Sequence, residues 1–321
     1  MRVLVTGGAG FIGSNFVRMV LNDPVSHINS VTVLDALTYS GNLANLKNYL
    51  DNPKLKFVQE DIRNSNVVRS LVQDHDAIIN FAAESHVDRS INSREEFIST
   101  NVVGTQVLLD AAIEFGVRKY LQISTDEVYG SITVGSAKED DSLEPNSPYS
   151  ASKAAGDLLV RSYVQTFGLD ASITRSSNNY GPFQHTEKLI PHFITNLIRD
   201  KQVPIYGDGT NIRDWIHVDD NCRGILKVFL SGAPGEIYNI GGNNEASNLE
   251  ITRMLLHELD KSEDYIEYVT DRLGHDLRYS INSTKIRETL SFQPEVDFKN
   301  GLKSVVKWYV DNSLWWENQT V

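Results

Sequence analysis

Two short stretches of the chain carry side chains suited to acid–base chemistry, and the first holds Tyr149 and Lys153. These residues stand four positions apart in a helical run that begins with Pro148, so they share one face of a helix. A free tyrosine titrates near about 10, and it becomes a base at neutral pH only where positive charge stabilises the phenolate. Lys153 can supply that charge, and the pair predicts oxidation of an alcohol.

The second stretch, Thr125-Asp126-Glu127, places two carboxyl groups upstream of the first. Hydride transfer alone needs no such acid pair, so the pair suggests that oxidation prepares a further step, such as elimination of water. An acid that donates a proton at neutral pH must have a raised pKa, which burial and a neighbouring carboxylate both favour. A helix-capping role is the alternative for Asp126 taken alone.

A glycine-rich turn follows the first apolar run of the chain. Gly8, Gly10 and Gly13 fit the G-x-G-x-x-G spacing, which allows a tight turn, close approach of the backbone to a pyrophosphate and close helix packing. The next apolar run ends in Asp35, whose carboxylate can accept hydrogen bonds from an adenosine ribose. Residues 36–39 include no arginine or lysine for a 2′-phosphate, so the motif favours NAD over NADP.

A parallel sheet is needed to position these motifs, and the first half of the chain alternates short apolar runs with helical stretches. This rhythm predicts an α/β fold with a doubly wound parallel (Rossmann) sheet and a smaller mixed α/β domain for the substrate. The expected strands are residues 2–6, 31–35, 55–59, 77–82, 119–124 and 171–174. We expect the NAD-binding domain in residues 1–175 with a returning segment 212–240, and the substrate domain in 176–211 and 241–321.

The composition limits the class of protein. The 321 residues carry a formal net charge of −12, which argues against a general nucleic-acid binder, because such proteins need a basic surface. No apolar run is long enough to span a bilayer, and the first residues leave no room for a signal peptide. A single cysteine, Cys222, agrees with a reducing compartment. We therefore expect a cytoplasmic protein that binds neither nucleic acid nor membrane and, from the histidine spacing, no metal.

Longer motifs make the chain similar to a known family. It resembles the extended short-chain dehydrogenase/reductases, and within them the dTDP-glucose 4,6-dehydratases, in TGGAGFIGSNFV, LDALTYSGNL, FAAESHVDRSI, ISTDEVYG, PYSASKAAGD, EKLIPHF and DRLGHDLRY. The resemblance runs along nearly the whole chain. It implies NAD as cofactor, dTDP-glucose as substrate, a role in deoxysugar synthesis, most commonly of L-rhamnose, and a homodimer formed through residues 101–115 and 150–167.

The resemblance also implies a mechanism. Tyr149 takes the proton of the glucose C4 hydroxyl while hydride leaves C4 for NAD, and Lys153 lowers the pKa of the phenol. The 4-ketone acidifies the C5 hydrogen, which Glu127 removes, while Asp126 protonates the departing C6 hydroxyl. The stored hydride then returns to C6. Thr125 hydrogen-bonds the C4 oxygen.

The resemblance assigns further residues to the two ligands. The candidate cofactor-binding residues, beside Tyr149 and Lys153, are Gly7, Gly10, Phe11, Ile12, Gly13, Asp35, Ala36, Leu37, Thr38, Asp61, Ile62, Phe81, Ala82, Ala83, Asn101, Ser124 and Asn179. The candidate substrate-binding residues, beside Thr125, are Ser85, His86, Asn178, Glu187, Lys188, Leu189, Ile190, Pro204, Ile205, Tyr206, Arg213, Asn248, His275 and Arg278. A surface ion pair is the alternative for Arg278.

Two rival hypotheses stay open at this point. One is another sugar-nucleotide enzyme of the same fold, either a 4-epimerase or a dehydratase for a different nucleotide. Related 4-epimerases generally lack the Asp126-Glu127 pair. The other is a non-catalytic protein that binds NAD and a partner, which has no reason to keep Tyr149, Lys153 and the acids together.

Overall fold

The structure, a computed structural model, describes residues 1–23 and 26–317. Within these residues a parallel sheet has the strand order β10-β6-β5-β4-β1-β2-β3. Its strands are β1 (Arg2–Thr6), β2 (Ser30–Asp35), β3 (Leu55–Gln59), β4 (Ala77–Asn80), β5 (Lys119–Thr125), β6 (Ala171–Ser176) and β10 (Ile237–Ile240). The order reverses between β1 and β4, so ligands are expected at the carboxyl ends of these strands. The predicted doubly wound parallel sheet is confirmed.

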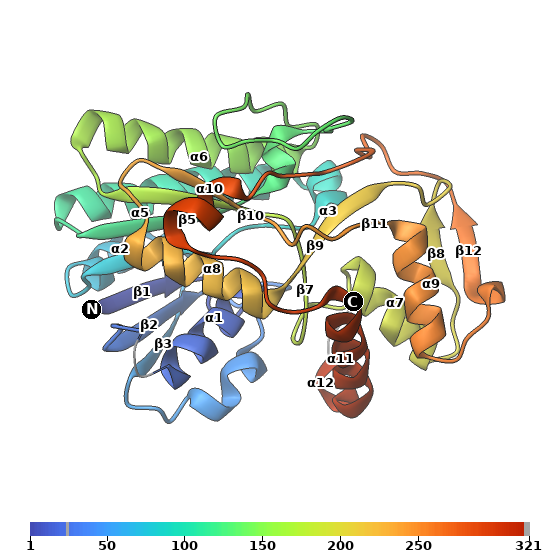
Figure 1. Ribbon diagram of the computed structural model, residues 1–321. Helices are drawn as coiled ribbons and strands as arrows, with labels where there is room; N and C mark the ends of the chain where they lie inside the picture. Colours follow the sequence, from blue (N-terminus) through green and yellow to red (C-terminus); the bar gives the residue numbers. More distant parts are fainter. Residues whose placement is uncertain (24–25, 318–321) are drawn as a thin grey trace.

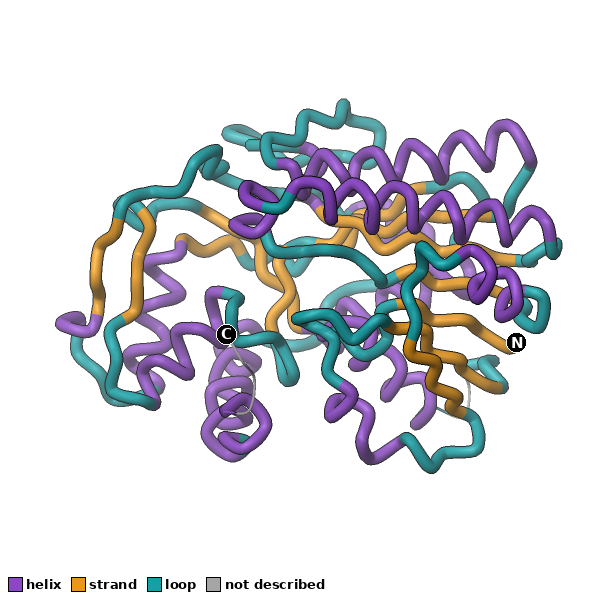
Figure 2. The backbone as a smooth tube through the Cα atoms, turned by 180° about the vertical axis from the view of Figure 1, so that it is seen from behind, coloured by secondary structure: helices purple, strands orange, loops and turns teal. Residues whose placement is uncertain are grey.

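Helices cover both faces of this sheet (Figures 1 and 2). They are α1 (Phe11–Asn22), α2 (Ser65–Val72), α5 (Thr105–Glu114), α6 (Pro148–Phe167), α8 (Val218–Ser231) and α10 (Thr284–Leu290). The short helices α3 (Val87–Asn92) and α4 (Arg94–Ile98) pack on α6. Shorter helical turns span Leu43–Tyr49, Ser99–Gly104, Asp126–Tyr129 and Glu263–Tyr265. The longest of the helices named, α6, begins with a capping box between Ser147 and Ser150 and ends at Gly168 in the left-handed conformation.

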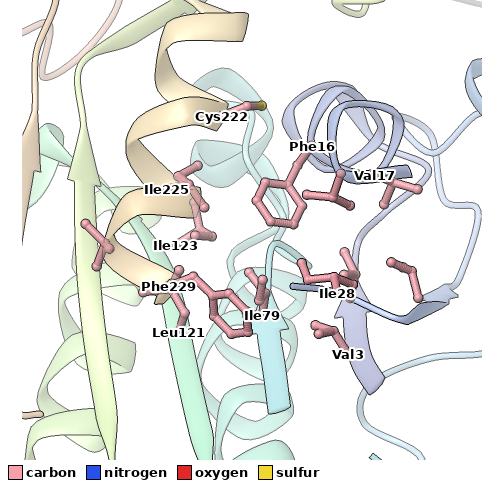
Figure 3. Packing of buried hydrophobic residues seen from close by; sticks show 14 of the residues in the cluster. Val3, Phe16, Val17, Ile28, Ile79, Leu121, Ile123, Cys222, Ile225 and Phe229 are labelled. Carbon is pink, nitrogen blue, oxygen red and sulfur yellow. The ribbon is translucent and has the colours of Figure 1, made fainter. Parts of the chain in front are cut away.

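Alternation along β1 shows how the strands bury side chains on both faces. Val3 and Val5 belong to the core under α1 and α8, whereas Leu4 belongs to the core under α2, α5 and α6. Figure 3 shows the first core, where Phe16 of α1 and Phe229 of α8 point into the layer between these helices and the strands. Burial on both faces explains why the sequence of these strands is a continuous apolar run.

The smaller part of the molecule contains a three-stranded sheet, β11-β9-β7, and a two-stranded sheet, β12-β8, within the described residues. Its elements are β7 (Asn178–Tyr180), α7 (Leu189–Ile198), β8 (Val203–Tyr206), β9 (Ile212–His217), β11 (Glu245–Ser247), α9 (Asn248–Glu258), β12 (Ile266–Val269), α11 (Phe298–Asp311) and α12 (Ser313–Glu317). A separate apolar core holds them together, and it includes Tyr309 and Trp316 of the C-terminal helices.

The chain returns once to the large sheet, where β10 pairs in parallel with β6. Helix α8 precedes it and packs on α1, while β9 stays in the three-stranded sheet. In the part of the chain that the structure describes, no helix combines the length and the apolar character needed to cross a membrane.

Candidate active site

A cavity of about 980 Å³ opens at the carboxyl ends of β1, β2, β4 and β5. It brings together the glycine turn, the acid pair and the start of α6. The predicted site residues in its lining are Gly7, Gly10, Phe11, Ile12, Gly13, Asp35, Ala36, Thr38, Asp61, Ile62, Phe81, Ala82, Ala83, Ser85, His86, Ser124, Thr125, Asp126, Glu127, Tyr149, Lys153, Asn178, Asn179, Glu187 and Lys188.

The glycine turn after β1 packs so closely on neighbouring backbone that Gly7 and Gly13 cannot carry a side chain. Gly7 has a φ of +66°, and a Cβ there would lie 2.6 Å from the backbone nitrogen of Ala82. A Cβ on Gly13 would lie 2.2 Å from the carbonyl oxygen of Gly7. Gly8 of the G-x-G-x-x-G spacing faces Val33 in the core, whereas Gly7, which we assigned to the cofactor, lines the cavity.

Asp35 ends β2 and is nearly buried. Its carboxylate accepts hydrogen bonds from the backbone nitrogens of Ala9 (2.9 Å) and Leu37 (2.8 Å). Burial raises its pKa, and these two bonds oppose that shift. Arg63 also lines the cavity, but its guanidinium pairs with Asp61 at 2.6 Å. The local cation is therefore neutralised, which agrees with a cofactor that lacks a 2′-phosphate.

Two of the residues that we assigned to the cofactor lie outside the cavity lining. The backbone nitrogen of Leu37 donates a hydrogen bond to the Asp35 carboxylate, and Leu37 itself does not line the cavity. Asn101 is buried behind the wall, where its side chain bonds the backbone of Glu84 and donates to Ser152 Oγ at 2.8 Å. The sequence could not show this, because the orientation of Asn101 depends on the turn of helix into which it folds.

Tyr149 and Lys153 lie one turn apart at the start of α6. The Nζ of Lys153 donates to the carbonyl of Ile123 at 2.6 Å, which ties the lysine to the end of β5. Burial lowers the pKa of Lys153 to about 8, and Asp157 partly opposes this. Burial raises the pKa of Tyr149 well above its usual value, as does Glu127, whereas a hydrogen bond with Thr125 lowers it.

Behind Lys153 lies a buried ion pair. Asp157, on α6, accepts from the Nε of Arg175 on β6 at 2.9 Å, and the two side chains are 1% and 3% exposed. Arg175 also donates to the hydroxyl of Tyr129 at 2.8 Å. Asp157 therefore places a negative charge near Lys153 without competing for a ligand in the cavity.

The acid pair occupies the helical turn after β5. Burial raises the pKa of Asp126 well above its usual value, and the charges of Glu127 and Asp214 add to this shift. Burial also raises the pKa of Glu127, but Arg213 and other cations oppose that shift. The surroundings thus favour a protonated Asp126 beside a more readily ionised Glu127, which is the arrangement that an acid and a base need.

The outer wall of the cavity comes from the turns after β4 and β7. Lys188 donates to the carbonyl of Ser85 at 2.7 Å and so joins the two parts of the molecule. Arg89 stacks over the ring of Tyr39, with 3.9 Å from its guanidinium carbon to the ring centroid, and contacts Glu187 at 3.4 Å. These contacts close one side of the cavity.

Several predicted substrate residues lie outside the cavity lining. Ile190 and Ile205 are buried in the core of the smaller part. Arg278 pairs with Glu245 at 2.6 Å and donates to the carbonyls of Ile132 and Gly135, which is the ion-pair alternative raised above. The others are Leu189 at the start of α7, Pro204 and Tyr206 on β8, Arg213 on β9, Asn248 at the start of α9 and His275 in the loop after β12.

Three of these residues make notable contacts: His275 and Tyr206 contact one another, and Arg213 acts on the acid pair. His275 lies edge-on to Tyr206 with 6.3 Å between ring centroids, and its Nδ1 lies 2.6 Å from Asp271. Arg213 is buried, donates to the carbonyl of Asp276 at 2.9 Å, and acts electrostatically on both Asp126 and Glu127.

Sequence reasoning missed some side chains at the site. Tyr39, Glu84 and Arg89 line the cavity, and Arg272 acts electrostatically on Glu127 while contacting Asp88 at 3.6 Å. Arg89 and Arg272 stand inside the quoted strings FAAESHVDRSI and DRLGHDLRY, so the signal was present but carried no stated role. Among the described residues, no group of three or more His, Cys, Asp or Glu side chains is arranged to hold a metal ion.

Comparisons with known proteins bear on this arrangement. The family model for GDP-mannose 4,6 dehydratase matches residues 4–305. The chain belongs to this family of extended short-chain dehydrogenase/reductases. The family resemblance read from the sequence motifs is therefore confirmed.

Relatives within the family share about half of their residues with the chain. The low-salt glycan biosynthesis protein Agl12 of Haloferax volcanii is 55% identical over 310 residues, which cover 97% of this chain and 99% of that protein. A dTDP-glucose 4,6-dehydratase of Streptomyces niveus is 52% identical over 319 residues, covering 99% of this chain and 95% of that protein. The crystal structure of a dTDP-glucose 4,6-dehydratase from Streptomyces venezuelae with NAD bound matches at a TM-score of 0.98 and 52% identity, covering 100% of both chains.

Proposed function

We propose that this protein is an NAD-dependent dTDP-glucose 4,6-dehydratase, a hydro-lyase that forms dTDP-4-keto-6-deoxyglucose. One observation carries the proposal: Tyr149 and Lys153 share a cavity with two adjacent acids, Asp126 and Glu127, whose surroundings act differently on their pKa values. Oxidation alone would use the first pair. The second pair adds an acid and a base for the elimination of water.

The residues at the glycine turn fit NAD. The turn presents Gly7, Gly10 and Gly13 to the cavity. Asp35 lies where a carboxylate is needed to accept hydrogen bonds from the adenosine ribose. Within the described residues, the buried Nδ1 of His86 and Oδ1 of Asn179 face this cavity without a hydrogen-bond partner from the protein. Bound NAD would accept a hydride from the sugar at C4 and give it back at C6.

Tyr149 acts as the base at the C4 hydroxyl in this proposal. Because burial and Glu127 both raise its pKa, the phenolate needs nearby positive charge and the hydrogen bond from Thr125. Lys153, with a pKa of about 8, is mostly protonated at pH 7 and supplies that charge. Its bond to Ile123 holds it in place during the step.

Glu127 removes the C5 proton once C4 is a ketone, and Asp126 protonates the leaving C6 hydroxyl. The pKa of Asp126 is raised by burial, Glu127 and Asp214, which keeps a proton on this acid at neutral pH. Arg213 opposes the corresponding shift of Glu127 and favours its ionised form. Each carboxyl group thus begins the elimination in the protonation state that its role requires.

The nucleotide end of the substrate lies toward the smaller part of the molecule in this proposal. We assign its diphosphate to Arg213 and Arg272, since guanidinium groups suit phosphate oxygens. Within the described residues, the buried Nε of Arg272 has no hydrogen-bond partner from the protein, which leaves a donor for such a ligand. Tyr206, Asn248 and His275 are proposed to contact the rest of the nucleotide.

The division of the chain follows from this assignment. Residues 1–175, with α8 and β10 of the returning segment 212–240, would bind NAD, and residues 176–211 and 241–321, together with β9, would bind the sugar nucleotide. We further propose that the enzyme is a homodimer, because Val103 and Leu158, in the two stretches expected at the dimer interface, expose apolar side chains to 45% and 54%. We place it in the cytoplasm because its single cysteine, Cys222, agrees with a reducing compartment. The pathway that we propose is deoxysugar synthesis, with L-rhamnose as its product.

Proton NMR of the protein with dTDP-glucose in deuterated water, with no cofactor added, tests the activity. A new C6 methyl signal with deuterium at C5 is expected, because the C5 proton exchanges with solvent and the hydride stays in the site. A product inverted at C4 would mean an epimerase instead. Turnover of UDP-, CDP- or GDP-glucose but not of dTDP-glucose would mean that the substrate carries a different nucleotide. No turnover of any of these sugars would contradict an enzymatic role.

A further inference from the structure

We propose that Asn45 and Trp315 are positioning residues for the cofactor, through which the C-terminal helix α12 holds the glycine turn in its binding form. The proposal rests on the proposed function, since it takes NAD as the ligand of that turn. It also gives a role to the C-terminal aromatic residues, which the mechanism above does not use.

The contact runs from α12 to the glycine turn through one amide. The indole Nε1 of Trp315 donates to Oδ1 of Asn45 at 2.9 Å, and Nδ2 of Asn45 donates to the carbonyl of Ala9 at 2.9 Å. Asn45 is 4% exposed. Because Trp315 fixes the oxygen of the amide, it also fixes the direction in which the amide nitrogen points.

Both backbone polar groups of Ala9, its carbonyl and its N–H, are hydrogen-bonded. Its carbonyl accepts from the backbone of Asn42 as well as from Asn45, and its N–H donates to the Asp35 carboxylate. The same residue therefore joins the phosphate-binding turn to the carboxylate assigned to the ribose. A change at Asn45 would reach both parts of the cofactor site without touching the cofactor.

Neighbouring residues hold this contact from both parts of the molecule. Arg18 donates to the carbonyl of Asn45 at 3.0 Å and lies 3.8 Å from the ring centroid of Phe183. Phe183 has a φ of +69° and packs against Trp308 and Trp315, with centroids 4.6 and 5.6 Å away. A backbone conformation that is costly for a phenylalanine persists where its surroundings determine it. The aromatic cluster of Phe183, Trp308 and Trp315 thus seats Trp315 against the cofactor domain.

The test is the rate at which holoenzyme exchanges bound NAD for labelled NAD. Trp315→Phe keeps an aromatic ring but removes the N–H donor, and we expect exchange to become about two- to tenfold faster, the range for one neutral hydrogen bond. Trp308→Phe is the matched control, because it keeps an aromatic ring to pack on Phe183 and Trp315 and leaves the hydrogen bond from Trp315 to Asn45 in place. Its exchange rate should match that of the wild type. The KM for dTDP-glucose at saturating NAD should change in neither variant.

Asn45→Ala provides a second, independent variant. It should speed exchange at least as much as Trp315→Phe, and Trp315→Phe added to it should have no further effect, because the shared bond is already absent. Unchanged exchange in Trp315→Phe, equal acceleration in Trp308→Phe, or additive effects of Asn45→Ala and Trp315→Phe would each overturn the inference. A wild-type protein that holds no NAD would instead overturn the proposed function, and this inference with it.

Discussion

The buried ion pair of Asp157 and Arg175 offers a test of how the site is charged. Asp157→Asn keeps the size of the side chain but leaves the Arg175 guanidinium, 3% exposed, without its anion. Removing one partner of a buried pair costs about 3–5 kcal/mol, because a charge remains buried without compensation. We expect the free energy of unfolding to fall by about this amount.

The same substitution should change the pH dependence of the reaction. Asp157 raises the pKa of Lys153 against burial, which lowers it to about 8. Without that carboxylate the lysine pKa falls further, so at a given pH above neutrality less Lys153 carries the charge that the Tyr149 phenolate needs. The alkaline limb of kcat/KM should therefore move to lower pH.

Urea unfolding and a pH profile of kcat/KM measure the two effects. Asp311→Asn is a control, because its ion pair with Lys307 is exposed, at 53% and 75%, and should contribute less than about 1 kcal/mol. Removing both buried charges, in Asp157→Asn with Arg175→Gln, should recover part of the stability and keep the shifted profile. Wild-type stability and an unmoved alkaline limb in Asp157→Asn would refute the reasoning.

Further predictions concern the reaction and the assembly. Glu127→Gln should still reduce bound NAD when dTDP-glucose is added but form the methyl product about 10²–10⁴-fold more slowly, as NMR can follow; normal turnover would remove Glu127 from the base role. Tyr149→Phe should slow the appearance of reduced nicotinamide absorbance by a similar factor, and rapid reduction would argue against Tyr149 as the first base. Leu158→Glu should shift the dimer to monomers in sedimentation, and an unchanged dimer would show that this face of α6 lies outside the interface.

Much of the large sheet could be predicted from the sequence because its signal is local. A strand buried on both faces reads as a short apolar run, as β1 does. The predicted bounds 2–6 and 55–59 agree with those of β1 and β3 in the structure. The candidate catalytic residues could likewise be brought together, since Tyr149 and Lys153 share a helix face and Asp126 and Glu127 directly follow a strand. These relations depend on neighbours in the chain.

The remaining features depend on contacts between distant segments. Gly8 matched the motif better than Gly7, yet which glycine faces the cavity is decided by Val33 and Ala82 on other segments. Arg278 could not be distinguished from a ligand-binding arginine until Glu245 was placed beside it. Local spacing carries no information about such partners, so the nucleotide end of the site is the part that the sequence described least well.

The return of β10 to the side of β6 has a consequence for how the protein is made. Every residue of β6 is buried, and β10 is its outer neighbour in the sheet. During synthesis β6 emerges some sixty residues before β10, and until then it presents an open strand edge whose backbone groups can pair with another chain. A fragment ending at residue 175 would keep that edge permanently, so we expect it to aggregate, whereas a fragment that includes β10 can cover the edge of β6.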